Sequence, residues 1–201
     1  IGRDLSLLSH FRQMGVVYMT LCHNGDNDIC DSARGHAEHG GLSAFGQEVV
    51  REMNALGMMI DMSHAAESSF YDALALSQAP IVCSHSSSRA LCSHPRNLTD
   101  DQMKALAAQG GVAQVTLYHG FLRHEGEATV LDALDHLHHM VQVMGPEHVG
   151  IGTDFDGDGG VRGLKDASEL IGFTRQLLRR RYSESDLQGI WGGNFLRVMR
   201  Q

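Results

Sequence analysis

The chain has 201 residues, 42% of them hydrophobic and 20% charged, with a formal net charge of −8. This length suits one domain, residues 1–201, with a substantial core. The acidic balance, without any basic cluster interleaved with aromatic residues, argues against nucleic acid as a partner. No apolar run approaches the length of a transmembrane helix.

The sequence opens at Ile1 without an initiator methionine, so we expect it to be a piece of a longer protein. A signal peptide or lipid anchor would precede this residue, which leaves the compartment open. The four cysteines lack zinc-knuckle spacing and are expected to be free thiols.

Five short runs are near-continuously apolar, and most contain β-branched residues, as in buried strands of a parallel sheet. In chain order they are VVYMTL (16–21), MMIDMS (58–63), PIVCS (80–84), VAQVTL (112–117) and HVGIGT (148–153).

Amphipathic helices are expected between and after these strands. They cover residues 43–57, 66–78, 99–110, 127–145 and 166–181, and the tail 183–200 reads as two short helices broken at Gly192-Gly193. In the first of them, Ser43 is the expected N-cap and Gly57 lies just past the end.

Strand–helix alternation predicts right-handed βαβ crossovers and a parallel sheet, either open and doubly wound or part of a (β/α)8 barrel. No glycine-rich phosphate-binding motif follows the first strand, which disfavours a nucleotide-binding open sheet. A whole barrel needs about 250 residues. The fold expected here is therefore the C-terminal five βα units of a TIM-type barrel.

Polar residues with catalytic chemistry follow each strand, at the edge where barrels build their active sites. They are His23, His64, His85, the pair Tyr118-His119, and Asp154. Because such residues follow all five strands at the same edge, a functional site is favoured over a purely structural role for these side chains.

His64 and His85 are 21 residues apart, one βα unit, so neighbouring strands should hold them side by side. Parallel strands lie about 4.8 Å apart, and two imidazoles can then share one Zn²⁺ at about 2.0–2.1 Å. Two histidines do not complete a hydrolytic zinc site, so a carboxylate must come from elsewhere.

The stretch DFDGDGG (154–160) begins like an EF-hand loop, but Lys165 stands where the bidentate glutamate belongs, and a strand precedes it. Its three carboxylates would also repel a phosphate. Asp154, nearest the strand end, is the candidate for chemistry, with glycines clearing space around it, whereas Asp156 and Asp158 are expected to form the loop or face solvent.

Several motifs together resemble the membrane (renal) dipeptidase family of zinc peptidases. They are YMTLCHN, IDMSH followed 21 residues later by SHSS, HPRNLTDDQM, GIGTDFDG and GGNFLRV, in order from about Leu5 to Met199. The resemblance implies a (β/α)8 metal-dependent hydrolase barrel that uses two zinc ions to cleave dipeptides.

Residue by residue, the resemblance implies that His64 and His85 bind one zinc of the pair. His23 would contact the substrate and polarise its carbonyl or stabilise the oxyanion. Arg96 would pair with the substrate carboxylate, and Asp154 would bind the substrate amine and assist proton transfer. Dipeptides are then the expected partners, and a homodimer is left open.

The family's other zinc ligands, a His-x-Asp pair and a bridging glutamate, would precede Ile1. The chain thus carries two of five ligands, and as given it is expected to be inactive, without a complete two-metal centre.

Two alternatives stay open: another amidohydrolase-like metal hydrolase, or a non-catalytic barrel relic. His136, His138 and His139 are expected on a polar helix face, and His119 is left without an assigned role.

Overall fold

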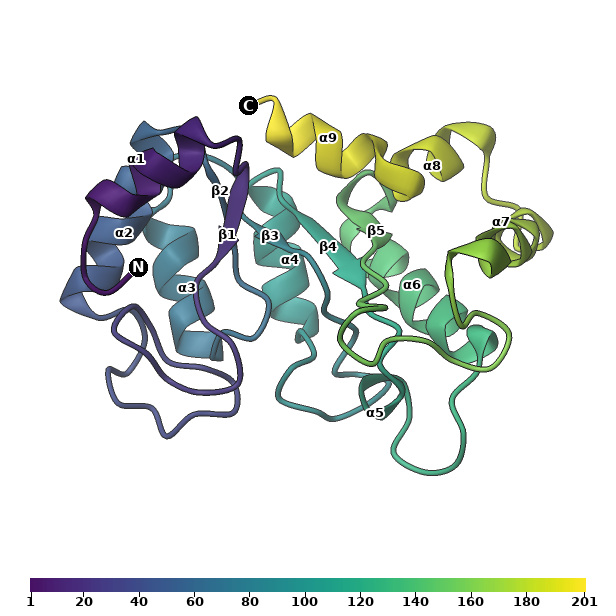
Figure 1. The fold of residues 1–201 in the computed structure, drawn as a ribbon. Coiled ribbons are helices and arrows are strands. Elements are labelled where there is room, and N and C mark those ends of the chain that lie inside the picture. Colours follow the sequence, from purple (N-terminus) through teal and green to yellow (C-terminus); the bar gives the residue numbers. More distant parts are fainter.

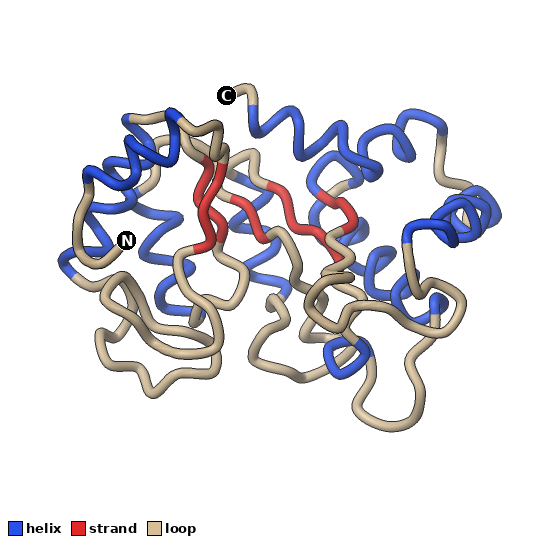
Figure 2. The backbone as a smooth tube through the Cα atoms, viewed as in Figure 1, coloured by secondary structure: helices blue, strands red, loops and turns tan.

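Five short parallel strands form one sheet in the computed structural model, which describes residues 1–201 (Figures 1 and 2). Their spatial order follows the chain, β1-β2-β3-β4-β5, and every neighbouring pair is parallel. The strands are β1 (Tyr18–Thr20), β2 (Met59–Asp61), β3 (Val82–Cys83), β4 (Val112–Val115) and β5 (Val149–Ile151). All five lie inside the predicted runs, which overestimated their lengths.

Helices precede, connect and follow the strands. In the first half they are α1 (Ser6–Gln13), α2 (Ala44–Ala55), α3 (Glu67–Leu76) and α4 (Asp100–Ala108). In the second half they are α5 (His119–Leu122), α6 (Val130–Met144), η1 (Pro146–His148), η2 (Ala167–Glu169), α7 (Leu170–Arg179), α8 (Glu184–Gln188), η3 (Gly189–Gly193) and α9 (Asn194–Met199). Helix α2 contacts β2, α4 contacts β4, and α6 contacts both β4 and β5, as crossover helices do (Figure 1).

The predicted cap of α2 is confirmed, because the Ser43 side chain accepts a hydrogen bond from the backbone N–H of Gly46. The helices α1 and α5 were not predicted. Helix α1 begins at Ser6, and its N-cap residue Leu5 makes no side-chain hydrogen bond, so the helix lacks the usual start signal.

The main core is a cluster of 39 buried residues between the sheet and its helices. A second, smaller cluster joins Met59, Val82 and Val112 to Val198 of α9, with Phe195 packed against it. Helix α9 therefore covers the end of the sheet opposite the long loops that follow the strands (Figure 1). The predicted break in the tail is also present, since Gly192 has a φ of +144°.

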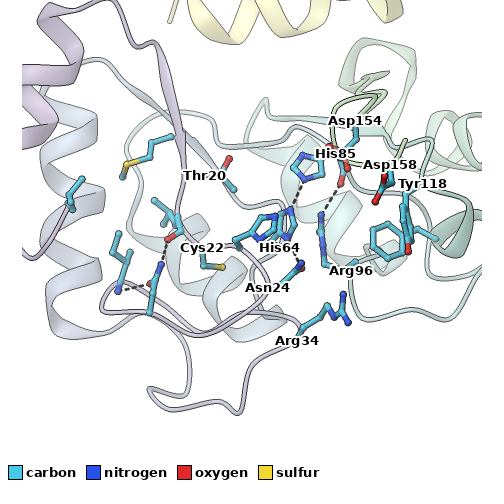
Figure 3. Close-up of a pocket in the computed structure, with 18 residues that line it drawn as sticks. Thr20, Cys22, Asn24, Arg34, His64, His85, Arg96, Tyr118, Asp154 and Asp158 are labelled. Atoms are coloured by element: carbon cyan, nitrogen blue, oxygen red, sulfur yellow. Dashed lines mark hydrogen bonds between the residues drawn. The ribbon is translucent and has the colours of Figure 1, made fainter. Parts of the chain in front are cut away.

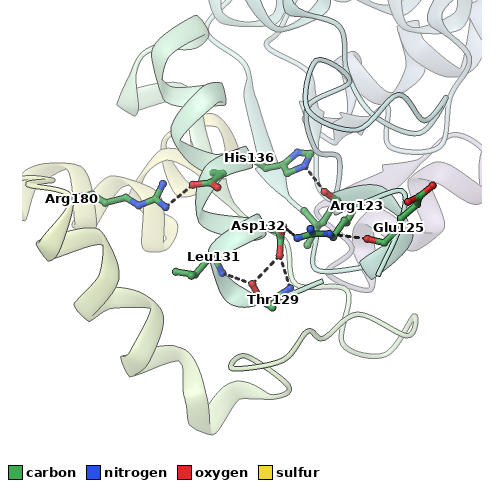
Figure 4. Close-up of polar contacts among 9 residues, drawn as sticks. Arg123, Glu125, Thr129, Leu131, Asp132, His136 and Arg180 are labelled. Carbon is green, nitrogen blue, oxygen red and sulfur yellow. Dashed lines mark hydrogen bonds and ion pairs between the residues drawn. The ribbon is translucent and has the colours of Figure 1, made fainter. Parts of the chain in front are cut away.

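Helix α6 begins with a capping box (Figure 4). The Thr129 hydroxyl accepts a hydrogen bond from Leu131 N at 3.2 Å, and Asp132 Oδ2 accepts one from Thr129 N at 2.8 Å. On the same helix, the prediction that His136 lies on a polar surface is wrong. It is 1% exposed, and both of its ring nitrogens have hydrogen-bond partners.

The four cysteines are buried free thiols, as expected. None of the helices combines the length and apolarity required to cross a membrane.

Candidate functional site

A cavity of about 800 Å³ opens where the loops leave the carboxyl ends of the strands (Figure 3). It is lined by 18 residues, among them all five candidates named from the sequence: His23, His64, His85, Arg96 and Asp154. Four separate βα loops contribute these side chains, so only the folded sheet brings them together. This is where a TIM-type barrel places its active site.

The imidazoles of His64 and His85 face each other across the cavity, as the spacing predicted. Their Nε2 atoms lie 2.8 Å apart and their ring centroids 4.8 Å apart. The strands that carry them, β2 and β3, are paired at Asp61 and Val82. Two ligands at about 2.0–2.1 Å from a tetrahedral ion lie roughly 3.3 Å apart, so a small movement of either ring would admit a metal ion.

Both rings turn Nε2 toward each other and Nδ1 toward a neighbouring polar group. The other nitrogen of His64, Nδ1, lies 3.3 Å from Asn24 Oδ1, and Nδ1 of His85 lies 2.8 Å from Ser84 Oγ. The two Nε2 atoms, 2.8 Å apart, share one hydrogen bond, in which one ring donates to the other. Both Nε2 atoms therefore face the same point in the cavity.

Burial keeps both imidazoles neutral, which is the form that binds a metal. Burial is the main cause that lowers the pKa of His64 to about 2, and the nearby charge of Arg96 adds to it. The pKa of His85 is lowered by the same two causes in the same order.

His64 and Asp154 both have left-handed backbone conformations, with φ of +73° and +56°. Such values cost energy for residues other than glycine and concentrate at functional sites. The carbonyl of His64 accepts a hydrogen bond from Ala33 N at 2.7 Å. That of Asp154 accepts bonds from Gly157 N at 2.9 Å and Gly159 N at 2.7 Å. These bonds hold both residues in the strained conformation.

Glycines do clear space around Asp154, as expected. A Cβ on Gly157 would lie 2.6 Å from Asp154 Oδ1, and one on Gly159 would lie 2.1 Å from the carbonyl oxygen of Thr153. Burial raises the pKa of Asp154, with His85 as the largest opposing influence. Asp158, expected only to form the loop or face solvent, also lines the cavity (Figure 3).

Arg96 is a buried cation, 3% exposed. Its guanidinium lies 5.4 Å from the ring centroid of Phe121, and Nη2 approaches the carbonyl oxygen of His85 at 3.5 Å. Nε is buried without any hydrogen-bond partner. Burial lowers the pKa of Arg96 to about 10, so the side chain stays charged at neutral pH. An anion in the cavity would satisfy it.

His23 completes the arrangement beyond the end of β1. Its ring centroid lies 4.3 Å from that of His64, tilted by 33°, and its carbonyl oxygen accepts a hydrogen bond from Ser32 Oγ at 2.6 Å. Tyr118 also lines this cavity, whereas its neighbour His119 lines a different one.

The chain has no group of three or more His, Cys, Asp or Glu side chains arranged to bind a metal ion. The donor set would fit part of a metal site, because it provides two imidazoles whose Nε2 atoms converge. A parallel α/β sheet with such a cluster at its carboxyl edge is typical of TIM-barrel metal hydrolases.

Comparison with known proteins identifies the family to which this chain belongs. The family model described as membrane dipeptidase (peptidase family M19) matches residues 1–201. The chain belongs to this family, whose fold is a TIM-type barrel and whose members are metallopeptidases.

Curated relatives include a protein of Schizosaccharomyces pombe named an uncharacterized dipeptidase, 40% identical over all of this chain and 50% of its own length. Dipeptidase 3 of Mus musculus is 40% identical over all of this chain and 42% of its own length. The chain thus spans about half the length of these relatives.

Solved structures of related proteins have the same fold as this chain. The probable dipeptidase PvdM of Pseudomonas aeruginosa superposes with a TM-score of 0.95 at 31% identity, over 98% of this chain and 65% of its own. A metallopeptidase of Rhodobacter sphaeroides, solved with a phosphinate mimic of the dipeptide L-Ala-D-Ala, gives 0.92 at 28% identity, over 100% of this chain and 60% of its own.

Proposed function

We propose that the protein to which this chain belongs is a zinc-dependent dipeptidase that hydrolyses the peptide bond of dipeptides. The observation that carries the proposal is the shared cavity of two converging imidazoles and one buried arginine without an anionic partner. Family membership and the names of the relatives support it, as does the dipeptide mimic bound by the Rhodobacter sphaeroides protein.

His64 and His85 would hold one zinc through their Nε2 atoms, and the remaining ligands would come from outside these 201 residues. Zinc bound there supplies Lewis acidity and lowers the pKa of a coordinated water toward neutrality. The lowered pKa values of the two histidines support this role, because neither ring has to lose a proton before binding a metal at neutral pH.

Arg96 would bind the substrate carboxylate. Its planar fork of N–H donors suits a carboxylate, and its unpartnered Nε supplies a donor that the protein itself leaves unused. Asp154 would bind the substrate amine and carry a proton to the leaving amine. Its raised pKa brings the carboxyl group nearer to the range in which it can exchange protons.

His23 would hydrogen-bond the substrate carbonyl and stabilise the negative charge that develops on its oxygen. Recognition of both charged termini by Arg96 and Asp154 would restrict the substrate to two residues, because a longer peptide moves one terminus out of reach.

The test uses the full-length protein, with zinc content measured by elemental analysis and hydrolysis measured on four compounds. We expect zinc to be bound and a free dipeptide to be cleaved, whereas the N-acetylated dipeptide, the dipeptide amide and the tripeptide are poor substrates. Cleavage of the blocked compounds as fast as the free dipeptide would favour a different amidohydrolase activity. Zinc binding without any cleavage would favour a non-catalytic relic.

A further inference from the structure

Asp61 is a carboxylate buried inside an apolar strand, 0% exposed at the end of β2. Its Oδ1 accepts hydrogen bonds from Ser63 N at 3.0 Å and Ser84 N at 2.9 Å. Its Oδ2 accepts bonds from Thr20 Oγ1 and Ser84 Oγ, both at 2.6 Å. All four donors are uncharged, so the negative charge is hydrogen-bonded but not neutralised. A buried charge of this kind is expensive to keep.

One of these four donors connects Asp61 to the metal site. Ser84 has a single hydroxyl proton, and its Oγ contacts both Asp61 Oδ2 at 2.6 Å and His85 Nδ1 at 2.8 Å. The carboxylate is the stronger acceptor, so the hydroxyl donates to Asp61. The alternative acceptor, Ser63 Oγ, is neutral and farther away, at 3.4 Å.

The direction of this bond fixes the proton on the histidine. Because Ser84 Oγ donates to Asp61, it can only accept from His85, and Nδ1 of His85 must carry a hydrogen. The lone pair is then on Nε2, the atom that lies 2.8 Å from His64 Nε2. A second bond, from His85 N to Ser63 Oγ at 2.9 Å, holds the backbone of the same residue.

We propose that Asp61 is a positioning residue that acts through Ser84 to hold His85 in the Nδ1–H tautomer and so keeps its Nε2 available for the metal. This deepens the proposed function and depends on the metal site proposed above. Outer partners of this kind orient metal ligands, and their loss typically costs about 10–100-fold in metal affinity. Here the serine hydroxyl relays the effect of the carboxylate to the ring.

A purely structural role for Asp61 is the competing explanation, since it links β1, β2 and β3. The two roles differ in what happens when Oδ2 becomes an N–H donor. In Asp61→Asn, the backbone N–H groups of Ser63 and Ser84 keep the amide oxygen in the place of Oδ1, so the amide nitrogen takes the place of Oδ2. It then donates to Ser84 Oγ, whose own proton must turn to His85 Nδ1. The ring then favours the Nε2–H tautomer and must change tautomer before Nε2 can bind a metal.

The experiment measures zinc affinity of the full-length protein by competition with a chelator. We expect Asp61→Asn to weaken zinc binding by about 10–100-fold. In a Ser84→Ala background the hydroxyl that links Asp61 to His85 is already absent. Asp61→Asn should therefore weaken zinc binding by less than about threefold in that background. Equal losses in the two backgrounds, or no loss in either, would overturn the proposal.

Thr20→Val is the matched control. It removes a hydrogen bond of the same length to the same oxygen of Asp61 but leaves the hydrogen bonds of Ser84 and His85 in place. We expect it to lower the thermal midpoint while zinc affinity stays within about twofold of the wild type, because the ring keeps its tautomer. A zinc loss as large as that of Asp61→Asn would mean that Asp61 acts only by holding the strands.

Should Asp61→Asn fail to fold, Ser84 alone provides the test. Ser84→Ala removes the hydroxyl and Ser84→Thr retains it, so zinc affinity should fall in the first and be kept in the second. Wild-type affinity in Ser84→Ala would overturn the proposal.

The ¹⁵N chemical shifts of His85 in metal-free protein separate this proposal from the proposed function. We expect an Nδ1–H ring in the wild type and an Nε2–H ring in Asp61→Asn. Those shifts in a protein that binds no zinc would support the relay and refute the zinc site. An unchanged tautomer in Asp61→Asn would refute the relay even if zinc is bound.

Discussion

His64 Nε2 and His85 Nε2 lie 2.8 Å apart, and burial lowers the pKa of both rings. In the proposed function this pair binds one zinc ion. His85→Ala in the full-length protein should therefore remove bound zinc and dipeptide hydrolysis together, measured by elemental analysis and by release of free amino acids. His10→Ala, at an exposed histidine of α1, is the control and should change neither. Retention of both zinc and activity in His85→Ala would refute the ligand assignment.

Arg96→Met should move activity and stability in different directions. A buried charge bound to the substrate carboxylate is worth about 2–5 kcal/mol, so kcat/KM for dipeptides should fall on the order of 30-fold or more. The free energy of unfolding should be unchanged or higher by about 1 kcal/mol, because the variant no longer buries a guanidinium whose Nε has no partner.

If Arg96 binds the substrate carboxylate, Arg96→Met should lose the ability to distinguish a dipeptide from its amide. The wild type should strongly prefer the free carboxylate, and Arg96→Met should treat the two compounds almost alike. A variant that keeps the preference would show that another group binds the carboxylate.

Gly157→Ala should displace the Asp154 carboxylate, since the added Cβ would lie 2.6 Å from Oδ1. We expect kcat/KM to fall at least tenfold, an effect of about 1.4 kcal/mol, while bound zinc is retained. Gly172→Ala in α7 is the matched control, because its Cβ would meet nothing within 4 Å. It should keep full activity and gain about 1 kcal/mol of helix stability. Equal activity of the two variants would argue against a role for Asp154 in chemistry.

His136 should make the fold sensitive to acid. Its Nδ1 accepts a hydrogen bond from Ser88 N at 3.0 Å, and its Nε2 donates to the carbonyl oxygen of Leu122 at 3.1 Å, which requires the neutral ring (Figure 4). Burial lowers the pKa of His136 below its ordinary value of 6.5. The unfolded chain therefore binds this proton more readily than the folded one. The stability that His136 contributes is present above pH 6.5 and is lost as the pH falls toward the lower folded pKa.

Comparison of thermal midpoints between pH 7 and 5 tests this effect. His136→Gln keeps a donor and an acceptor but cannot titrate, so its midpoint should fall less steeply with acidification than that of the wild type. Parallel curves would mean that His136 protonates equally well in both states. Contributions from the other histidines cancel in the comparison.

The strand-end residues could be predicted from sequence because strand periodicity and one βα spacing place them without any knowledge of packing. His64, His85 and Asp154 each follow an apolar run directly, and parallel strands align their ends. Arg96 is different. Only the family resemblance marked it, because its burial depends on Phe121 and on the path of a loop that has no periodicity.

Asp61 was missed although it carried a signal, a charged residue within the apolar run MMIDMS. Its partner Thr20 lies on β1 and its partner Ser84 directly follows β3, and only the register of the strands shows that they meet. The burial of His136 was missed for a related reason. Its polar contacts come from Ser88 and Leu122, which lie outside α6, so helical periodicity could not reveal them.

The positive φ angles of His64 and Asp154 also bear on how this protein would change under selection. At such positions glycine is conformationally cheaper, by roughly 1 kcal/mol or more. A variant library selected for thermal stability alone should therefore enrich glycine at residues 64 and 154, whereas selection for peptide hydrolysis should purge it. Selection for thermal stability and selection for catalytic activity would then favour different residues at these two positions.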